Sequence, residues 1–411
     1  MICVDVRCSR VSRLVPLLTL LLFFGLSLVH APCAQATSVA DSRARYVVIA
    51  TNDLGMHCYQ RSYAGFMILP PANNLRAQVF RRGDDAHLVR RGIIVTYRIL
   101  NNTSSAGKTD FWRYASSYGF PGLRPDVGIT GNALSGRMKL AADGRSWVAT
   151  AIPVTPYDDQ LVFNPLQVAK ITVRSKSTGH VLATLPKVVV PVSDEMRCDY
   201  CHGPVDTAGS ILRAHDTANG TTLATDLLAG NRHACSECHA DNALGATGNG
   251  ALPLSQVIHG FHADKMTMTS VAPSCYACHP GAQTKCLRGR MAQAGFTCTD
   301  AKCHGSMADV ATSQAAGRRA WLDEPACGGC HDAAHAENPG ALYRNSYLAN
   351  GPEGMKVILC ESCHGSPHAE WRSARPVDNA EPLTLQGLAT YIKRCAVCHP
   401  GRGRVHGNRA G

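Results

Sequence analysis

Seven short motifs combine two cysteines with a histidine, the residue types that form thioethers and bind metals. Six of them read Cys-x-x-Cys-His, and one has a wider gap between its thiols. In chain order, as motifs one to seven, they are Cys198/Cys201/His202, Cys235/Cys238/His239, Cys275/Cys278/His279, Cys298/Cys303/His304, Cys327/Cys330/His331, Cys360/Cys363/His364 and Cys395/Cys398/His399. This pattern is typical of covalent c-type haem attachment. On a helical turn, residues three apart share a face and the next lies beside the first, so two thioethers can hold the porphyrin edge while the imidazole faces the iron.

Zinc is the alternative, because two Cys-x-x-Cys pairs can also form a tetrahedral metal site. In this chain each of the seven cysteine pairs is followed at once by histidine, which a zinc ribbon does not require. The sequence therefore favours seven covalently attached haem c groups, each with an iron.

Motif four has four residues between its thiols, where the other motifs have two. A regular helix would point these thiols apart, so we expect its loop to bulge. Cys286 is an alternative to Cys298 as the partner of Cys303. The shorter loop is favoured because it closes at a lower entropy cost.

The ligand opposite each motif histidine separates electron transfer from catalysis. Seven further histidines lie in the same half of the chain, one for each motif: His215, His233, His259, His262, His335, His368 and His406. We therefore expect two histidines at every iron. His335 and His368 follow their own motif histidine by four residues, too close to reach the far side of the same iron. Each should serve a neighbouring haem.

Other soft ligands remain. Methionines near the motifs could replace a histidine, although most such residues fill gaps in the core; they are Met266, Met268, Met291 and Met307. Cys58 and Cys286 are left over from the pairs, and we expect either a disulfide between the two halves or two buried free thiols. His57 beside Cys58 could ligate a haem or a metal, or belong to a packed turn.

The N-terminus has the layout of a secretory signal peptide over residues 1–36. Arg7, Arg10 and Arg13 precede an apolar stretch at 14–29, and the small-residue pattern Ala34-Gln35-Ala36 follows it. The stretch is shorter than the roughly 20 residues that a membrane span needs. Lipidation at Cys33 is disfavoured by the residues before it. The sequence predicts an exported chain, periplasmic or at the cell surface, with no transmembrane span after processing.

Residues 45–192 read as short strands and predict an all-β, sandwich-like domain. Val95, Tyr97 and Ile99 alternate with polar residues, and a second alternating run covers 171–174. Turn residues at 143–144 and 177–179 predict two hairpins.

Residues 197–411 predict an irregular domain of short helices and loops. Brief helical patterns cover 222–229, ended by Gly230, and 384–394. With so few large apolar side chains, this region needs a bound apolar cofactor to complete its core.

The motif half of the chain resembles the multihaem c-type cytochromes, particularly at Cys363-His364-Gly365-Ser366-Pro367-His368 and Cys398-His399-Pro400. A β-domain ahead of it resembles outer-surface and extracellular electron-transfer cytochromes. This resemblance implies a heptahaem carrier that exchanges electrons with other cytochromes or redox proteins, and a possible homopolymer formed through the β-domain.

Three other functions are compatible with parts of the sequence: catalysis, adhesion or assembly, and nucleic-acid binding. An oxidoreductase with one open haem could reduce a nitrogen or sulfur oxyanion, but such relatives often replace a motif histidine with lysine, which does not occur here. The β-domain could instead be an adhesion or assembly module. The formal net charge of +11 permits nucleic acid as a partner, but Lys and Arg are dispersed and no recognition motif is present. Electron transfer is favoured over catalysis.

Overall fold

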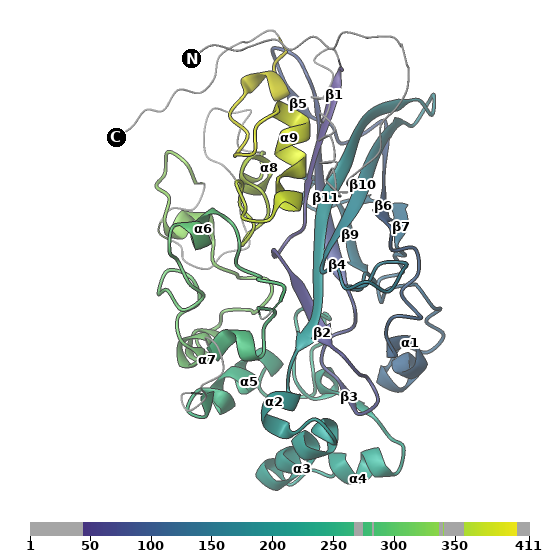
Figure 1. Ribbon diagram of the computed structural model, residues 1–411, viewed down its shortest axis with the longest axis vertical. Helices are drawn as coiled ribbons and strands as arrows, with labels where there is room; N and C mark the ends of the chain where they lie inside the picture. Colours follow the sequence, from purple (N-terminus) through teal and green to yellow (C-terminus); the bar gives the residue numbers. More distant parts are fainter. Residues whose placement is uncertain (1–43, 267–273, 282, 337–339, 341–356, 401–411) are drawn as a thin grey trace, which may run out of the picture. The chain divides into compact units, whose positions relative to one another are not determined.

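The computed structural model describes residues 44–266, 274–281, 283–336, 340 and 357–400 (Figure 1). The predicted signal segment, Met268 and His406 lie outside these residues. The described residues belong to one compact unit. A β-rich region comes first and a region of short helices and loops follows, as the sequence predicts.

Two five-stranded sheets form the β-rich region. The first has the order β1-β4-β9-β8, with β5 also paired to β4, and all its pairs are antiparallel. Its strands are β1 (Tyr46–Thr51), β4 (Asn73–Arg81), β5 (His87–Leu88), β8 (Lys139–Leu140) and β9 (Trp147–Ile152). The second has the order β2-β11-β10-β6-β7, and only β2 with β11 is parallel. Its strands are β2 (His57–Gln60), β6 (Ile93–Leu100), β7 (Ser135–Arg137), β10 (Leu166–Ser175) and β11 (Val181–Met196).

Alternation along the strands produces one hydrophobic core that both sheets share. Val95, Tyr97 and Ile99 on β6 are buried together with Leu75 and Val79 of β4. The sandwich-like packing follows, because each sheet has one apolar face to cover.

Both predicted hairpins are confirmed. Asp143-Gly144 connects β8 to the antiparallel β9, and the loop at 177–179 connects β10 to β11. Gly144 and Gly179 have φ values of 67° and 73°, in the left-handed region that favours glycine.

Short helices make up the second region: α2 (Asp199–His202), α3 (Thr207–Asn219), α4 (Leu223–Leu228), α5 (Leu254–His262), α6 (Arg290–Gln293), α7 (Met307–Ala315), α8 (Cys360–His364) and α9 (Ala380–Gln386). The β-rich region adds α1 (Phe111–Tyr114). The helix predicted over 222–229 is α4. The one predicted over 384–394 is misplaced, because α9 begins at Ala380 and ends where Gly387 takes a left-handed conformation with φ 72°.

Contacts join the two regions along β1, β4 and β11. Val47, Ile49 and Phe80 pack against Leu385 of α9 and Val397 beside motif seven. The short strand β12 (His233–Ala234) pairs in parallel with β3 (Phe66–Met67). Within the described residues, no helix combines the length and apolar character needed to cross a membrane.

Candidate functional site

Each regular motif folds as a short helical turn, as its spacing predicts. Motif six forms α8, and motif one forms α2 together with its N-cap residue Cys198. Motifs two, three, five and seven contain short 3₁₀ turns. A hydrogen bond from the motif histidine N–H to the carbonyl of the first cysteine closes the turn, for example 3.0 Å from His202 to Cys198 and 2.7 Å from His399 to Cys395. This turn brings two thiols and an imidazole to one place.

Cys201 and Cys238 are the second cysteines of motifs one and two, and both belong to the predicted attachment sites. Both are exposed free thiols that the described residues do not enclose in a site, whereas the first cysteine of each motif is partly buried. Asn249 Nδ2 donates a hydrogen bond to the Cys238 Sγ at 3.6 Å. The physical reason is the short turn, which packs its first thiol against the chain and leaves the second on its outer side. A porphyrin bound at either motif would have to cover that second thiol.

The second cysteines of motifs three and five, Cys278 and Cys330, are exposed in the same way. Those of motifs four, six and seven are partly buried: Cys303, Cys363 and Cys398. The structure therefore places all fourteen predicted attachment cysteines on the motif turns, but it surrounds the second thiol with protein at only three of the seven motifs.

Motif four closes in the same way across its wider loop. The His304 N–H donates to the Cys298 carbonyl at 3.2 Å, although His304 is six positions after Cys298 and the other motif histidines are four positions after their first cysteine. The residues between them form turns and no regular helix, which is the bulge that the sequence predicts. This closure favours Cys298 over Cys286 as the partner of Cys303.

Five motif histidines each have a second imidazole beside them. The pairs, with the distances between ring centroids, are His202–His262 at 6.4 Å, His239–His215 at 6.4 Å, His279–His259 at 6.0 Å, His304–His368 at 6.1 Å and His331–His335 at 6.0 Å. Every pair joins one motif histidine to one of the histidines predicted as a second ligand.

The pair distances fit a metal ion held between two imidazoles. Two metal–imidazole bonds of about 2.0 Å, with about 1.1 Å from each ligating nitrogen to its ring centre, place the ring centres about 6 Å apart. Directly packed rings have centroid separations of about 4.5–7 Å, so this spacing admits a metal ion between the rings without requiring one. The donor set is therefore appropriate for a haem iron with two axial histidines.

Hydrogen bonds to Nδ1 orient the second imidazole in all five pairs. Nδ1 of His259 lies 2.7 Å from the Ser255 carbonyl, and that of His262 lies 2.8 Å from the Ile258 carbonyl. The remaining acceptors are Thr221 Oγ1 for His215, the Asp332 carboxylate for His335 and the Leu54 carbonyl for His368. With the proton on Nδ1, the lone pair of Nε2 is available to a metal, as in metal-ligating histidines generally.

Burial affects the charge of several of these rings. It lowers the pKa of His279 to about 4 and that of His304 to about 3, so both imidazoles are neutral at pH 7 and able to ligate. For His368, burial acts in the same direction, but Cys286 and Glu370 outweigh it and raise the pKa to about 9. Metal binding at His368 must therefore displace a proton from Nε2.

His368 and His335 differ from each other. His368 follows motif six, yet its ring faces His304 of motif four, in agreement with the prediction that it serves a neighbouring site. The same prediction is wrong for His335, whose ring lies beside His331 of its own motif. The backbone turns back after motif five, where the His335 N–H donates to the Asp332 carbonyl at 3.0 Å, and the Asp332 carboxylate then holds the ring.

Two further histidines lie beside carboxylates. His233 lies 2.8 Å from Glu237 Oε2 and 3.5 Å from Asp226 Oδ2, an arrangement of ion pairs. His57 is buried on β2, where its Nε2 lies 2.8 Å from the Asp53 carboxylate. Met266 is buried, and Met291 and Met307 lie at α6 and the start of α7. Among the described residues, no second imidazole contacts His364 or His399; the ring beside His364 is Tyr391, at 5.5 Å.

Neighbouring motifs lie side by side through their thiols. The thiols of Cys275 and Cys298 are hydrogen-bonded to each other, as are those of Cys327 and Cys360. Motif three therefore lies beside motif four, and motif five lies beside motif six.

Large apolar side chains are exposed next to the first motifs. Val205, three residues after His202, is 97% exposed, and Leu228 is 90% exposed. Phe261 is exposed as well, and its ring lies 5.3 Å from that of His262. Of these three side chains, Phe261 is the one whose ring contacts a paired imidazole.

The two leftover cysteines are free thiols and not a disulfide. Burial raises the pKa of the Cys58 thiol to about 12, with a further contribution from Cys286. No group of three or more His, Cys, Asp or Glu side chains within the described residues is arranged to hold a metal ion. The imidazole pairs differ from such a group because a haem iron takes only two ligands from the protein.

Sequence reasoning missed the residues of the β-rich region that support the motifs. His399 Nδ1 lies 2.9 Å from the Gly83 carbonyl, and Gly83 N–H donates to the Cys398 carbonyl at 3.1 Å. Gln78, buried on β4, accepts hydrogen bonds from the Leu359 N–H and the Ser362 hydroxyl of motif six. Gln78 belongs to the mixed polar and apolar run NNLRAQVFR of β4, so no sequence signal distinguishes it for this role.

Comparisons with family models, curated proteins and solved structures found no match.

Proposed function

We propose that the chain is an exported heptahaem c-type cytochrome that carries electrons along closely spaced haems to a periplasmic or extracellular acceptor. The observation that carries this proposal is the set of five imidazole pairs. Each combines one motif histidine with one histidine from outside the motifs at 6.0–6.4 Å. Such pairs suit electron transfer, because an iron with two protein ligands has no open position for a substrate.

The chain's own residues hold the cofactors and set their surroundings. The cysteines of each motif provide the two attachment points, and the motif histidine lies beside them on the same turn. A bound haem supplies an iron that accepts and releases one electron while keeping both ligands. The carboxylate, carbonyl or hydroxyl at Nδ1 of each second imidazole fixes the ring and would affect the potential at which this happens.

Contacts between motifs support a relay. Hydrogen-bonded thiols connect motif three to four and motif five to six. Helix α5 connects motif one to three, since His262 faces His202 and His259 faces His279. Neighbouring haems would therefore share short segments of chain, which favours short electron-transfer distances.

A second function is favoured by one specific observation. His364 has Tyr391 beside it instead of a second imidazole, and the described residues place no imidazole against His399. If one haem has an open position, it belongs to motif six or motif seven. That would give an oxidoreductase acting on a nitrogen or sulfur oxyanion, with the other haems delivering electrons.

The test is to express the chain with haem-maturation machinery and measure its haem content. Intact mass and the pyridine haemochrome spectrum should both give seven covalently bound haems per chain. A chain that binds zinc in place of haem, or binds neither, would contradict the proposal.

A further inference from the structure

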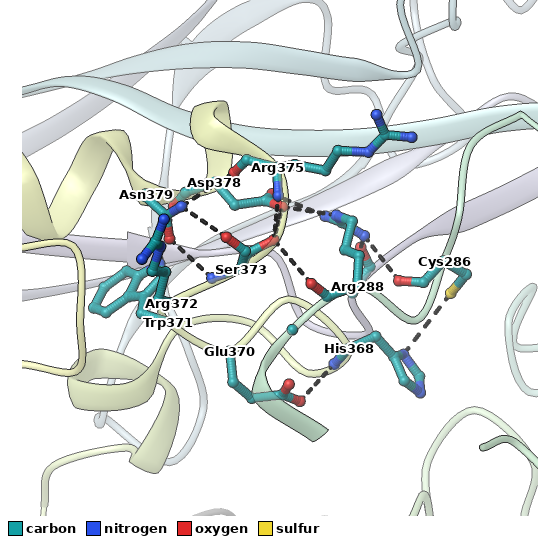
Figure 2. Close-up of polar contacts among 12 residues, drawn as sticks. Cys286, Arg288, His368, Glu370, Trp371, Arg372, Ser373, Arg375, Asp378 and Asn379 are labelled. Atoms are coloured by element: carbon teal, nitrogen blue, oxygen red, sulfur yellow. Dashed lines mark hydrogen bonds and ion pairs between the residues drawn. The ribbon is translucent and has the colours of Figure 1, made fainter. Parts of the chain in front are cut away.

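Arg288 is at the centre of a buried polar cluster that the motifs do not explain (Figure 2). Its guanidinium binds both carboxylate oxygens of Asp378, at 2.8 and 3.0 Å. The side chains of Arg288 and Asp378 are 2% and 3% exposed. Burying two charges is costly, so a pair of this kind requires several further hydrogen bonds.

Those further bonds connect three segments of the chain. The Arg288 guanidinium also donates to the Cys286 carbonyl at 3.0 Å and to the Gly55 carbonyl, on the loop before β2, at 3.5 Å. On the other side, the Ser373 hydroxyl lies 2.6 Å from Asp378 Oδ2, and Trp371 Nε1 donates to the Asp378 carbonyl at 3.0 Å. Residues 54–55, 286–289 and 366–378 are thereby fixed to one another.

His368 lies where these three segments meet. Its carbonyl accepts hydrogen bonds from the N–H groups of Arg288 and Gly289, both at 2.7 Å, and its own N–H donates to Glu370 Oε1 at 2.8 Å. Its Nδ1 lies 3.3 Å from the Leu54 carbonyl and 3.9 Å from Cys286 Sγ. Backbone and ring are therefore held by all three segments.

His368 needs such support because its φ is 65°, in the left-handed region. This conformation is unfavourable for residues other than glycine and persists only when the surroundings impose it. Space around it is also restricted: a Cβ at Gly55 would lie 2.1 Å from the Pro367 carbonyl oxygen, and one at Gly289 would lie 2.1 Å from Glu370 Oε2.

We propose that Arg288, through its pair with Asp378, is the positioning residue that aims His368 at the iron of motif four. Arg288 does not itself contact the cofactor. It fixes the left-handed turn that points the His368 ring across from motif six to His304. This inference rests on the proposed function.

Arg288→Lys and Asp378→Asn test it in the oxidised holoprotein. Lysine keeps the positive charge, but its single amine cannot replace the two guanidinium nitrogens that bind the Asp378 carboxylate. It also cannot at the same time reach the carbonyls of Gly55 and Cys286. Each variant should retain seven haems and show one haem in seven converted from low-spin to high-spin in EPR, the same change as in His368→Ala. Lys108→Met is the matched control, because it removes a buried lysine whose partners are Asn102 and Asp159; all its haems should stay as in the wild type.

The outcomes are distinct. If His368→Ala converts one haem while the Arg288 and Asp378 variants keep the wild-type spectrum, Arg288 has no positioning role. If His368→Ala leaves every haem low-spin, His368 is not a ligand and the inference is overturned. Should the Arg288 variant fail to accumulate, Ser373→Ala loosens the same carboxylate and should give a partial conversion at the same haem. A wild-type chain without haem overturns the proposed function itself.

Discussion

At the residue scale, the proposed haem relay depends on which histidines face one another. Counting spare histidines identified the five imidazoles that the structure places beside motif histidines. The count did not show that the His233 ring lies beside Glu237 and Asp226, because sequence spacing does not reveal such neighbours. It also failed for the partner of His335, because the Asp332 hydrogen bond turns that ring toward its own motif.

Cys298 and Cys286 provide a direct test of the unusual motif. We expect Cys298→Ser to lose one of two thioethers at motif four, because the His304 N–H closes the turn onto the Cys298 carbonyl. Cys286→Ser should keep all fourteen, since its thiol faces His368. Mass spectrometry of peptides that span residues 283–306 separates the two cases. A lost thioether in the Cys286 variant would mean that the long loop is the attachment site.

Glu381 gives a prediction about pH. Its side chain is 3% exposed, and its Oε1 accepts a hydrogen bond from Ala50 N–H at 2.9 Å. Burial raises its pKa well above the ordinary value of 4.5. The folded chain therefore keeps a proton that the unfolded chain releases, so stability falls as pH rises from 4.5 toward the raised pKa.

Glu381→Gln removes this linkage and keeps an acceptor for Ala50. The variant should have a higher free energy of unfolding than the wild type at pH 8, measured by thermal unfolding. The difference should grow by about 1.4 kcal/mol for each pH unit above 4.5 until the raised pKa is reached. The gain should disappear below about pH 4, where both states of the wild type are protonated. A gain that is the same at every pH would mean that packing, and not the proton, causes it.

At the element scale, helix α5 places one histidine beside each of two motifs. Its positions 259 and 262 are three apart and share a face, yet the rings reach motif three and motif one respectively. The sequence predicted both histidines as ligands but could not show that one helix connects two motifs that are separated by a third in the sequence.

Val257→Pro should therefore affect two haems at once. It removes the hydrogen bond from the Val257 N–H to the Pro253 carbonyl, 3.1 Å in length, at the start of the helix. EPR should show two haems in seven changed, against one for His262→Ala. A proline variant with one altered haem or none would contradict the role of α5.

At the scale of the whole molecule, the sequence predicted the division into a β-rich region and a region of short helices and loops. Alternation of apolar residues and turn residues was sufficient for this, because these signals are local. It could not predict that Gln78 and Ala50 of the first sheet, and Gly83 between β4 and β5, contact the later motif region, since about 280–330 residues separate the partners. Nor could motif spacing show that Cys201 and Cys238 lie exposed, because spacing places a thiol on a turn without saying what packs against it.

Mutation of Gln78 tests how much its hydrogen bonds to the segment around motif six stabilise the fold. Its side chain is fully buried and bonds to the Val357 carbonyl, the Leu359 N–H and the Ser362 hydroxyl. Gln78→Ala leaves these groups unsatisfied and should lower the free energy of unfolding by about 2–3 kcal/mol, measured by denaturant titration. Thr150→Ala, at an exposed position of neighbouring β9, is the control and should change it by less than about 0.5 kcal/mol.

The central claim is that paired imidazoles hold a relay of irons, and low-temperature EPR of the oxidised, purified holoprotein tests it most directly. We expect low-spin ferric signals that integrate to at least five haems, one for each motif with paired histidines. Any high-spin signal should come from motif six or seven, and only substitutions at those motifs should remove it. High-spin iron at motif one, two, three, four or five would contradict the claim.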